Sequence, residues 1–78
     1  MYLNSLKYFN GKNYSVSNYV NGVCIKHQNY TVYILPIKEF GVLKYFVKVF
    51  KNGNEINTFI HSNYKTLFTT VKNKITTL

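Results

Sequence analysis

The side chains able to do acid–base, nucleophilic or metal chemistry are few in this sequence: Cys24, His27, Glu39, Glu55 and His61. Cys24 and His27 are three residues apart in a strand-like run, which places them on opposite faces of a sheet. Both glutamates lie next to expected turns, where charged side chains are normally solvated. No pair of these residues has the spacing of a zinc site. We therefore predict no metal, no cofactor and no catalytic site, and we do not expect an enzyme.

A small ribonuclease is the alternative that uses these residues. A histidine can act as a general acid or base near neutral pH, and His61 is expected at the end of the last strand, next to the start of a helix. His27 is the other candidate. Because the sequence offers no second catalytic group for either, the simpler interpretation is a surface or capping histidine.

A second constellation consists of lysines and phenylalanines that alternate along one strand. Lys44, Phe46, Lys48 and Phe50 share one face of an extended chain, and Phe59 is expected beside them on the next strand. Aromatic rings can stack on nucleic-acid bases while ammonium groups contact the phosphates. The pattern predicts a nucleic-acid-binding surface. The alternative is that the phenylalanines are covered by the N-terminal helix, a long loop or a second subunit.

The C-terminal segment has the period of an amphipathic helix, with Ser62 as the expected N-cap. Lys65, Lys72 and Lys74 flank its apolar stripe, and their stems are expected along the seam between helix and sheet with the ammonium groups at its edges. We predict that these lysines join the nucleic-acid-binding set. The stripe consists of Tyr64, Leu67, Phe68, Val71, Ile75 and Leu78.

The clearest hairpin surrounds an Asn-Gly dipeptide, because both residues tolerate the positive φ of a type I′ turn. Asn52-Gly53 joins two β-branched and aromatic runs, 42–50 and 55–60. A two-residue loop gives one register, and a longer loop with a bulge would shift it. The pairs expected for the two-residue loop are Val49 with Ile56, Val47 with Thr58 and Tyr45 with Ile60.

Asn21-Gly22 predicts a second hairpin, between Tyr14–Val20 and Val23–His27. The first of these runs is polar and is expected to form only a short edge strand. The next run, Tyr30–Leu35, is apolar on both faces, which is typical of a central strand. Pro36 is expected to end it, because proline cannot donate a hydrogen bond to a central ladder.

The remaining segments complete the expected fold. Lys38–Gly41 is predicted to be a loop, and Leu3, Leu6 and Phe9 suit a short helix that ends at Gly11. All four glycines are predicted to lie in turns. The fold class is α+β in a single domain, 1–78, with a small antiparallel sheet of three or four strands. A C-terminal amphipathic helix packs on one face, and a short N-terminal helix precedes the sheet.

The charge balance points to an anionic partner. The net charge of +8 comes from 10 lysines and only two acidic residues. AT-rich codons account for abundant lysine but do not deplete the acids, so the shortage of acids is the stronger sign. Arginine is absent, so bidentate reading of guanine is excluded and binding should be weakly sequence-specific. The alternative is a protein whose lysines only keep it solvated.

The expected compartment is the cytoplasm of a bacterium or host cell. No apolar run approaches the roughly 20 residues of a membrane span, so no membrane partner is expected. The N-terminus lacks the basic and apolar regions of a signal peptide. The single cysteine excludes an internal disulfide, which fits a reducing compartment.

Residues 46–78 are similar in layout to the second half of a double-stranded-RNA-binding domain, a family with a helix, three strands and a helix. The strand start at Phe46, the turn at Asn52-Gly53 and Ser62 fall at comparable places. The lysine cluster of that family would fall at 63–65, where only Lys65 is basic, and its loop histidine and small-residue helix face are absent. Three strands and a C-terminal helix also resemble the DNA-binding arm domains of phage-type integrases. Neither layout assigns the chain to a family.

Two functions follow as predictions. The first is a small basic, non-catalytic protein that binds nucleic acid or a protein complex that handles nucleic acid. The second is a phage or mobile-element protein that inhibits or adapts a host protein, such as a defence or replication enzyme, by direct binding. Small size, AT-rich composition and an aromatic surface motivate the second. Self-association is compatible with either.

Overall fold

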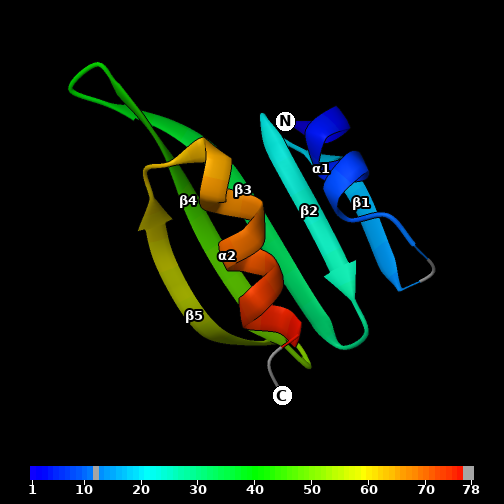
Figure 1. The fold of residues 1–78 in the computed structure, drawn as a ribbon. Coiled ribbons are helices and arrows are strands. Elements are labelled where there is room, and N and C mark those ends of the chain that lie inside the picture. Colours follow the sequence, from blue (N-terminus) through cyan, green and yellow to red (C-terminus); the bar gives the residue numbers. More distant parts are fainter. Residues whose placement is uncertain (12, 77–78) are drawn as a thin grey trace.

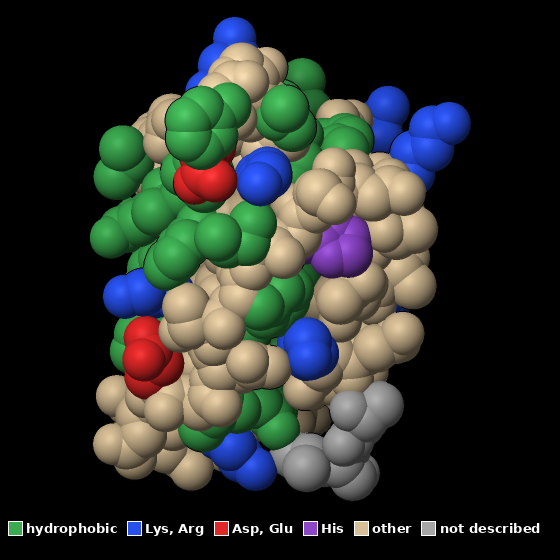
Figure 2. Space-filling view, turned by 90° about the vertical axis from the view of Figure 1, so that its left-hand side faces the viewer, with side chains coloured by type: hydrophobic (Ala, Val, Ile, Leu, Met, Phe, Trp, Pro, Cys, Tyr) green, Lys and Arg blue, Asp and Glu red, His purple; other side chains and the backbone are tan. Residues whose placement is uncertain are grey.

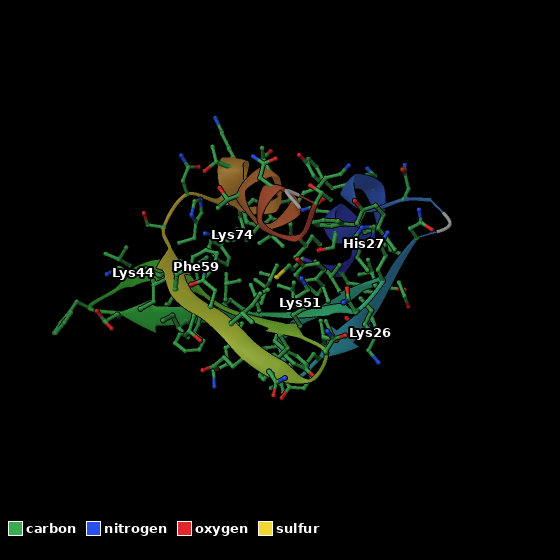
Figure 3. All side chains as sticks on the ribbon, turned by 90° about the horizontal axis from the view of Figure 1, so that it is seen from below. Lys26, His27, Lys44, Lys51, Phe59 and Lys74 are labelled. Atoms are coloured by element: carbon green, nitrogen blue, oxygen red, sulfur yellow. The ribbon has the colours of Figure 1, made fainter. Side chains whose placement is uncertain are left out.

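The computed structural model describes residues 1–11 and 13–76 and has two layers, a sheet and a pair of helices (Figure 1). Both helices lie on the same side of the sheet, so the other side is uncovered (Figure 3). We call the uncovered side the open face and the other side the helix face. The elements in chain order are α1 (Tyr2–Tyr8), β1 (Tyr14–Tyr19), β2 (Gly22–His27), β3 (Tyr30–Glu39), β4 (Val42–Lys51), β5 (Asn54–His61) and α2 (Tyr64–Thr76).

The sheet is antiparallel, and its five strands lie side by side in chain order. The α+β class and both predicted helices are confirmed, but the expected three or four strands are corrected to five. The polar run β1, expected to form only a short edge strand, pairs with β2 along its whole length, from Tyr14–His27 to Tyr19–Gly22. An edge strand needs apolar contacts on one side only, and Tyr14 and Val16 supply them by packing against the core.

The third strand runs on through Pro36, which was expected to end it, and turns back at Phe40-Gly41. The pairing of β2 with β3 stops at Ile34, so Pro36 has a strand neighbour only in β4. The Pro36 carbonyl accepts a hydrogen bond from Asn21 on the β2 side, and the proline nitrogen faces the same way. Pro36 costs the sheet no backbone hydrogen bond. The N–H that proline lacks would point to the side on which β2 no longer pairs with β3.

Half of the predicted loop Lys38–Gly41 is therefore strand, because β3 runs to Glu39. Phe40 and Gly41 form its two-residue turn, with φ of 52° and 77°, and Glu39 pairs with Val42. The turn extends past the neighbouring strands (Figure 1). At its tip the Phe40 side chain is 99% exposed. Sequence reasoning missed this turn because phenylalanine is rare at positive φ.

The predicted register of the β4–β5 hairpin is wrong by one residue. A bulge at Val49/Phe50 shifts the pairs to Val49–Asn57, Val47–Phe59 and Tyr45–His61. Because a one-residue slip turns every side chain to the other face, Phe59 lies on the helix face and not beside Phe46. The sequence analysis had named a bulge as one feature that would shift the register.

Helix α2 is confirmed, and its stripe of Leu67, Phe68, Val71 and Ile75 is buried against the sheet, with Tyr64 partly buried. Leu78, the last residue of the predicted stripe, lies outside the described residues. The expected cap Ser62 is corrected to Asn63, whose Oδ1 accepts a hydrogen bond from the Lys65 amide at 2.9 Å. Asn63 directly precedes the first helical residue, which is the position a cap requires.

Helix α1 is also confirmed, but it ends at Tyr8 and not at Gly11, and of Leu3, Leu6 and Phe9 only Phe9 is buried. Ser5 and Phe9 are buried, whereas Leu3 is 71% exposed. Ser5 fits because its hydroxyl donates to the Met1 carbonyl at 2.9 Å and leaves no unpaired donor. Within residues 1–11 and 13–76, no helix is long and apolar enough to cross a bilayer.

The core lies between the sheet and the helices. Gly22 belongs to a strand and not to the predicted turn, and a Cβ there would overlap the carbonyl of Ile34 on the neighbouring strand. The turn of that hairpin is Val20-Asn21, one position earlier than predicted, and Val20 adopts the positive φ, at 53°. The strand side chains at the centre of the core are Val23, Ile25, Val32, Ile34, Val47 and Val49.

Candidate functional site

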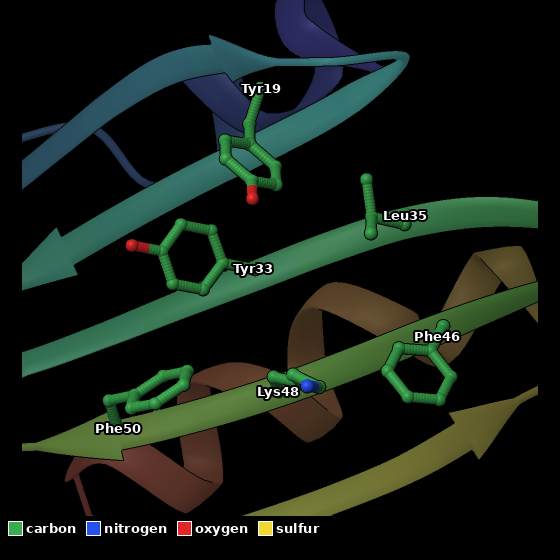
Figure 4. Close-up of a pocket in the computed structure, with 6 residues that line it drawn as sticks. All are labelled: Tyr19, Tyr33, Leu35, Phe46, Lys48 and Phe50. Atoms are coloured by element: carbon green, nitrogen blue, oxygen red, sulfur yellow. The ribbon is translucent and has the colours of Figure 1, made fainter. Parts of the chain in front are cut away.

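The open face carries a hollow of about 400 Å³ lined mainly by aromatic and aliphatic side chains (Figure 4). Alternation along β3 and β4 produces it. Val32, Ile34 and Val47 point into the core, so the residues between them point to the open face. The lining residues are Tyr19 from β1, Tyr33 and Leu35 from β3, and Phe46, Lys48 and Phe50 from β4.

The rings of this hollow lie in a connected row across the strands. The Tyr19 and Tyr33 ring centres are 4.7 Å apart, and Tyr33 meets Phe50 edge-on at 5.7 Å. The Lys48 ammonium lies 5.8 Å from the centre of the Phe46 ring. The row therefore offers several partly exposed rings on one surface, with a cation among them.

Sequence reasoning identified the β4 part of this row and missed the rest. Tyr33 and Leu35 alternate with the core residues of β3, and that alternation was a usable signal. Tyr19 could not be found in the same way, because it reaches the row only through the register of two successive hairpins, β1–β2 and β2–β3.

The two lysines predicted on this face are paired with the only two acidic residues of the sequence. Lys44 lies 3.6 Å from Glu39, and Lys48 lies 3.6 Å from Glu55. All four side chains are partly exposed, so each pair contributes at most about 1 kcal/mol. The open face is consequently close to neutral around its rings, and its lysines can exchange their carboxylate partners for another anion.

The structure separates the predicted site residues into two groups. Lys44, Phe46, Lys48 and Phe50 share the open face, as predicted. The predicted lysines of α2, which are Lys65, Lys72 and Lys74, belong to the layer on the helix face (Figure 3). One ligand cannot lie flat on both groups.

Two of the α2 lysines, Lys72 and Lys74, contact aromatic rings on the helix side of the sheet. The Lys72 ammonium lies 5.3 Å from the Tyr8 ring centre and 5.5 Å from that of Tyr14. The Lys74 ammonium lies 5.0 Å from the Phe59 ring centre. Lys72 and Lys74 thus lie over rings beside α2, whereas Lys65 lines the space between the two helices and not the predicted seam between helix and sheet.

An edge-on view of the molecule shows how different the two sides are (Figure 2). Hydrophobic side chains and the acidic side chains gather toward the sheet, and polar side chains cover the helix side. Glu39 and Glu55 are both tied to open-face lysines. Among the described residues, carboxylate side chains are thus confined to the open face.

The histidines do not come together. His27 is 7% exposed, stacks on Tyr14 at 4.3 Å and directs Nδ1 to the Asn13 carbonyl at 2.9 Å. His61 Nε2 lies 2.8 Å from the Thr66 hydroxyl. The register places His27 at one end of the sheet and His61 at the other, so they cannot act as one acid–base pair.

The free cysteine, Cys24, is buried and lies directly opposite Tyr33 on the adjacent strand, on the same face of the sheet. Burial raises the pKa of the Cys24 thiol above its usual 9.0, and this effect outweighs the opposing effects of Lys26 and of a hydrogen bond with Ser17. The thiol is therefore protonated at neutral pH and a weak nucleophile. In the part of the chain that the structure describes, no three His, Cys, Asp or Glu side chains gather as a metal-binding group.

No protein-family model, curated protein or solved structure matches this chain. The layout likeness to a double-stranded-RNA-binding domain is also altered by the fold, because five strands separate the two helices here and three do so in that family. The function has to be argued from the open face and the helix face themselves.

Proposed function

We propose that this protein is a small non-catalytic binding protein that takes single-stranded nucleic acid on its open face. The observation that carries the proposal is the row of rings from Tyr19 through Tyr33 to Phe50, with Phe46 beside it, on a sheet face that neither α1 nor α2 covers. Bases of a single strand can stack on such rings, whereas bases inside a duplex are already stacked on one another.

Stacking of bases on the rings is expected to make the main contribution to the binding free energy. A base stacked on an aromatic side chain contributes about 1–3 kcal/mol, and a hollow lined by several rings can hold more than one base. Lys44 and Lys48 lie at the same surface and would exchange their glutamate partners for phosphates at a cost of at most about 1 kcal/mol each. The net charge of +8 favours the approach of any polyanion.

The test is binding of a fluorescently labelled oligothymidylate and oligouridylate, followed by anisotropy at about 50 mM and about 200 mM salt. Affinity should fall as salt rises. The double variant Phe46→Leu/Phe50→Leu keeps apolar side chains but removes two rings, and it should weaken binding by about tenfold or more. The control Leu3→Ala changes an exposed residue of α1 and should leave the affinity unchanged.

Two outcomes contradict the proposal. Equal affinity of the parent protein and the Phe46→Leu/Phe50→Leu variant would show that the rings do not stack on bases. Affinity that does not depend on salt would show that phosphates are not contacted.

A second candidate function, direct binding of a host protein, is favoured by the β3–β4 turn. Phe40 is 99% exposed there, with Val42 and Leu43 about half exposed next to it. Exposed apolar groups at a projecting tip are typical of protein contacts and serve no phosphate. In this function the protein is an inhibitor or adaptor, as expected for a phage or mobile element. A partner retained from nuclease-treated lysate by the parent protein, and lost with Phe40→Ser, would favour it over nucleic-acid binding.

A further inference from the structure

A groove of about 490 Å³ lies between the two helices, on the side of the molecule away from the row of rings. Phe68 forms its floor, with the Tyr8 and Tyr64 rings against it at centre distances of 6.0 and 5.5 Å. Lys7 from α1 and Lys65 from α2 are exposed at its rim. Its lining residues are Asn4, Lys7, Tyr8, Tyr64, Lys65 and Phe68.

Hydrogen bonds between the two helices fix their spacing at the groove. Asn4 donates from Nδ2 to the Tyr64 hydroxyl at 2.6 Å, and the hydroxyls of Tyr8 and Thr69 are 2.8 Å apart. These bonds fix the two tyrosine rings that form the walls. The site is thus preformed, and a ligand would not have to order its walls on binding.

Charge decides what kind of ligand fits. Lys7 and Lys65 point two cations at the groove, while Glu39 and Glu55 are both engaged on the open face. Among the described residues, no carboxylate side chain opposes an anion that enters. An apolar aromatic floor between two cations is complementary to an apolar side chain with carboxylates on either side of it.

Length favours a protein segment over a nucleic-acid strand. The seven residues of α1 make a wall only about 10 Å long, which matches one anchoring side chain and its neighbours. The next lysine on α2, Lys72, lies over the Tyr8 and Tyr14 rings and does not continue a line of cations along the rim. A phosphate backbone would need such a line.

We propose that the groove between α1 and α2 docks a short acidic segment of a partner protein, with one aromatic or aliphatic side chain on Phe68 and carboxylates at Lys7 and Lys65. This inference does not depend on nucleic-acid binding at the open face. Together the two sites make the protein an adaptor, with one face for a strand and the other for an acidic protein.

The probe is a short synthetic peptide with one phenylalanine flanked on both sides by glutamates, titrated into isotope-labelled protein without nucleic acid. Backbone amide shifts should change in α1 and in the first half of α2, and not in β4. A peptide with serine in place of phenylalanine, and another with glutamines in place of the glutamates, should each bind at least about tenfold more weakly, which shows that anchor and charge are both needed.

Charge-matched variants separate the groove from general attraction. Lys7→Glu/Lys65→Glu should weaken peptide binding by about tenfold or more, whereas Lys26→Glu/Lys38→Glu, with the same change of net charge at exposed positions elsewhere, should not. Equal losses in the two variants would overturn the proposal, as would amide shifts confined to the sheet. An oligonucleotide that shifts the groove amides more strongly than the peptide would assign the groove to nucleic acid instead.

Discussion

Two anionic partners compete for Lys44 and Lys48 on the open face. Both lysines are paired with glutamates, and both would contact phosphates of the proposed ligand. The pairs span 3.6 Å and are partly exposed, so water and salt weaken them. A carboxylate beside a lysine still repels an incoming phosphate. Glu55 would therefore oppose the proposed nucleic-acid binding, and its removal should be visible in the affinity.

At the residue scale we expect Glu55→Gln to tighten binding of the labelled oligothymidylate by up to about fivefold at low salt, because Lys48 loses its competing partner. Lys48→Gln should weaken binding. Lys74→Gln makes the same charge change on the helix face and should have little effect. Anisotropy titrations check all three. An equal loss with Lys48→Gln and Lys74→Gln would mean that net charge, and not the open face, determines the affinity.

At the element scale, the sequence predicted the side-chain periodicity of helices and strands better than it predicted where strands end. The three- and four-residue spacing of α2 and the alternation of Lys44 with Phe46 depend only on local geometry, and both were correct. Pro36 was misjudged because its tolerance depends on where a different strand, β2, stops. Phe59 was placed on the wrong face because a bulge inserts one residue into β5 between the turn and the pairs with β4. The residue types of the two strands do not indicate such a bulge.

The cap of α2 gives a direct test at this scale. Asn63→Ala removes the side-chain acceptor of the Lys65 amide, and we expect it to lower the free energy of unfolding by about 1 kcal/mol. Ser62→Ala, one residue earlier at an exposed position, is the matched control and should change it by no more than about 0.5 kcal/mol. Urea titrations followed by circular dichroism measure both. A larger effect of Ser62→Ala would restore the cap predicted from the sequence.

At the scale of the whole molecule, one layer of helices leaves the sheet with two unlike faces. Sequence periodicity predicted that lysines would lie both on β4 and beside the stripe of α2, but only the layered arrangement shows that these groups face opposite ways. The lysines predicted as one binding set thus form two groups on opposite faces, and the group on the open face is paired with glutamates. The groups that limit stability at high pH lie in the sheet that both surfaces share.

Burial raises the pKa of the Tyr45 phenol above its usual 10.0, with a further contribution from Tyr64, and also raises the pKa of the Cys24 thiol. The unfolded chain therefore loses these protons at lower pH than the folded one. Their contribution to stability is complete below about pH 9 and is lost as pH rises through the raised values.

We expect the urea midpoint to fall between pH 9 and pH 11, and to fall less in the double variant Cys24→Ala/Tyr45→Phe once each protein is compared with itself at pH 7. The double variant keeps the Tyr45 ring and its packing. An identical decline in the parent and the double variant would show that other groups control alkaline unfolding.

The strand order of the sheet follows the order of the chain, so each hairpin can form between neighbouring segments without waiting for distant ones. The groove is different. Its walls come from the two ends of the sequence, and the bonds across it join residues 60 and 61 positions apart. A partner that binds the proposed groove would thus recognise only chains in which α1 and α2 have already packed together, whereas a strand on the open face would contact the sheet alone.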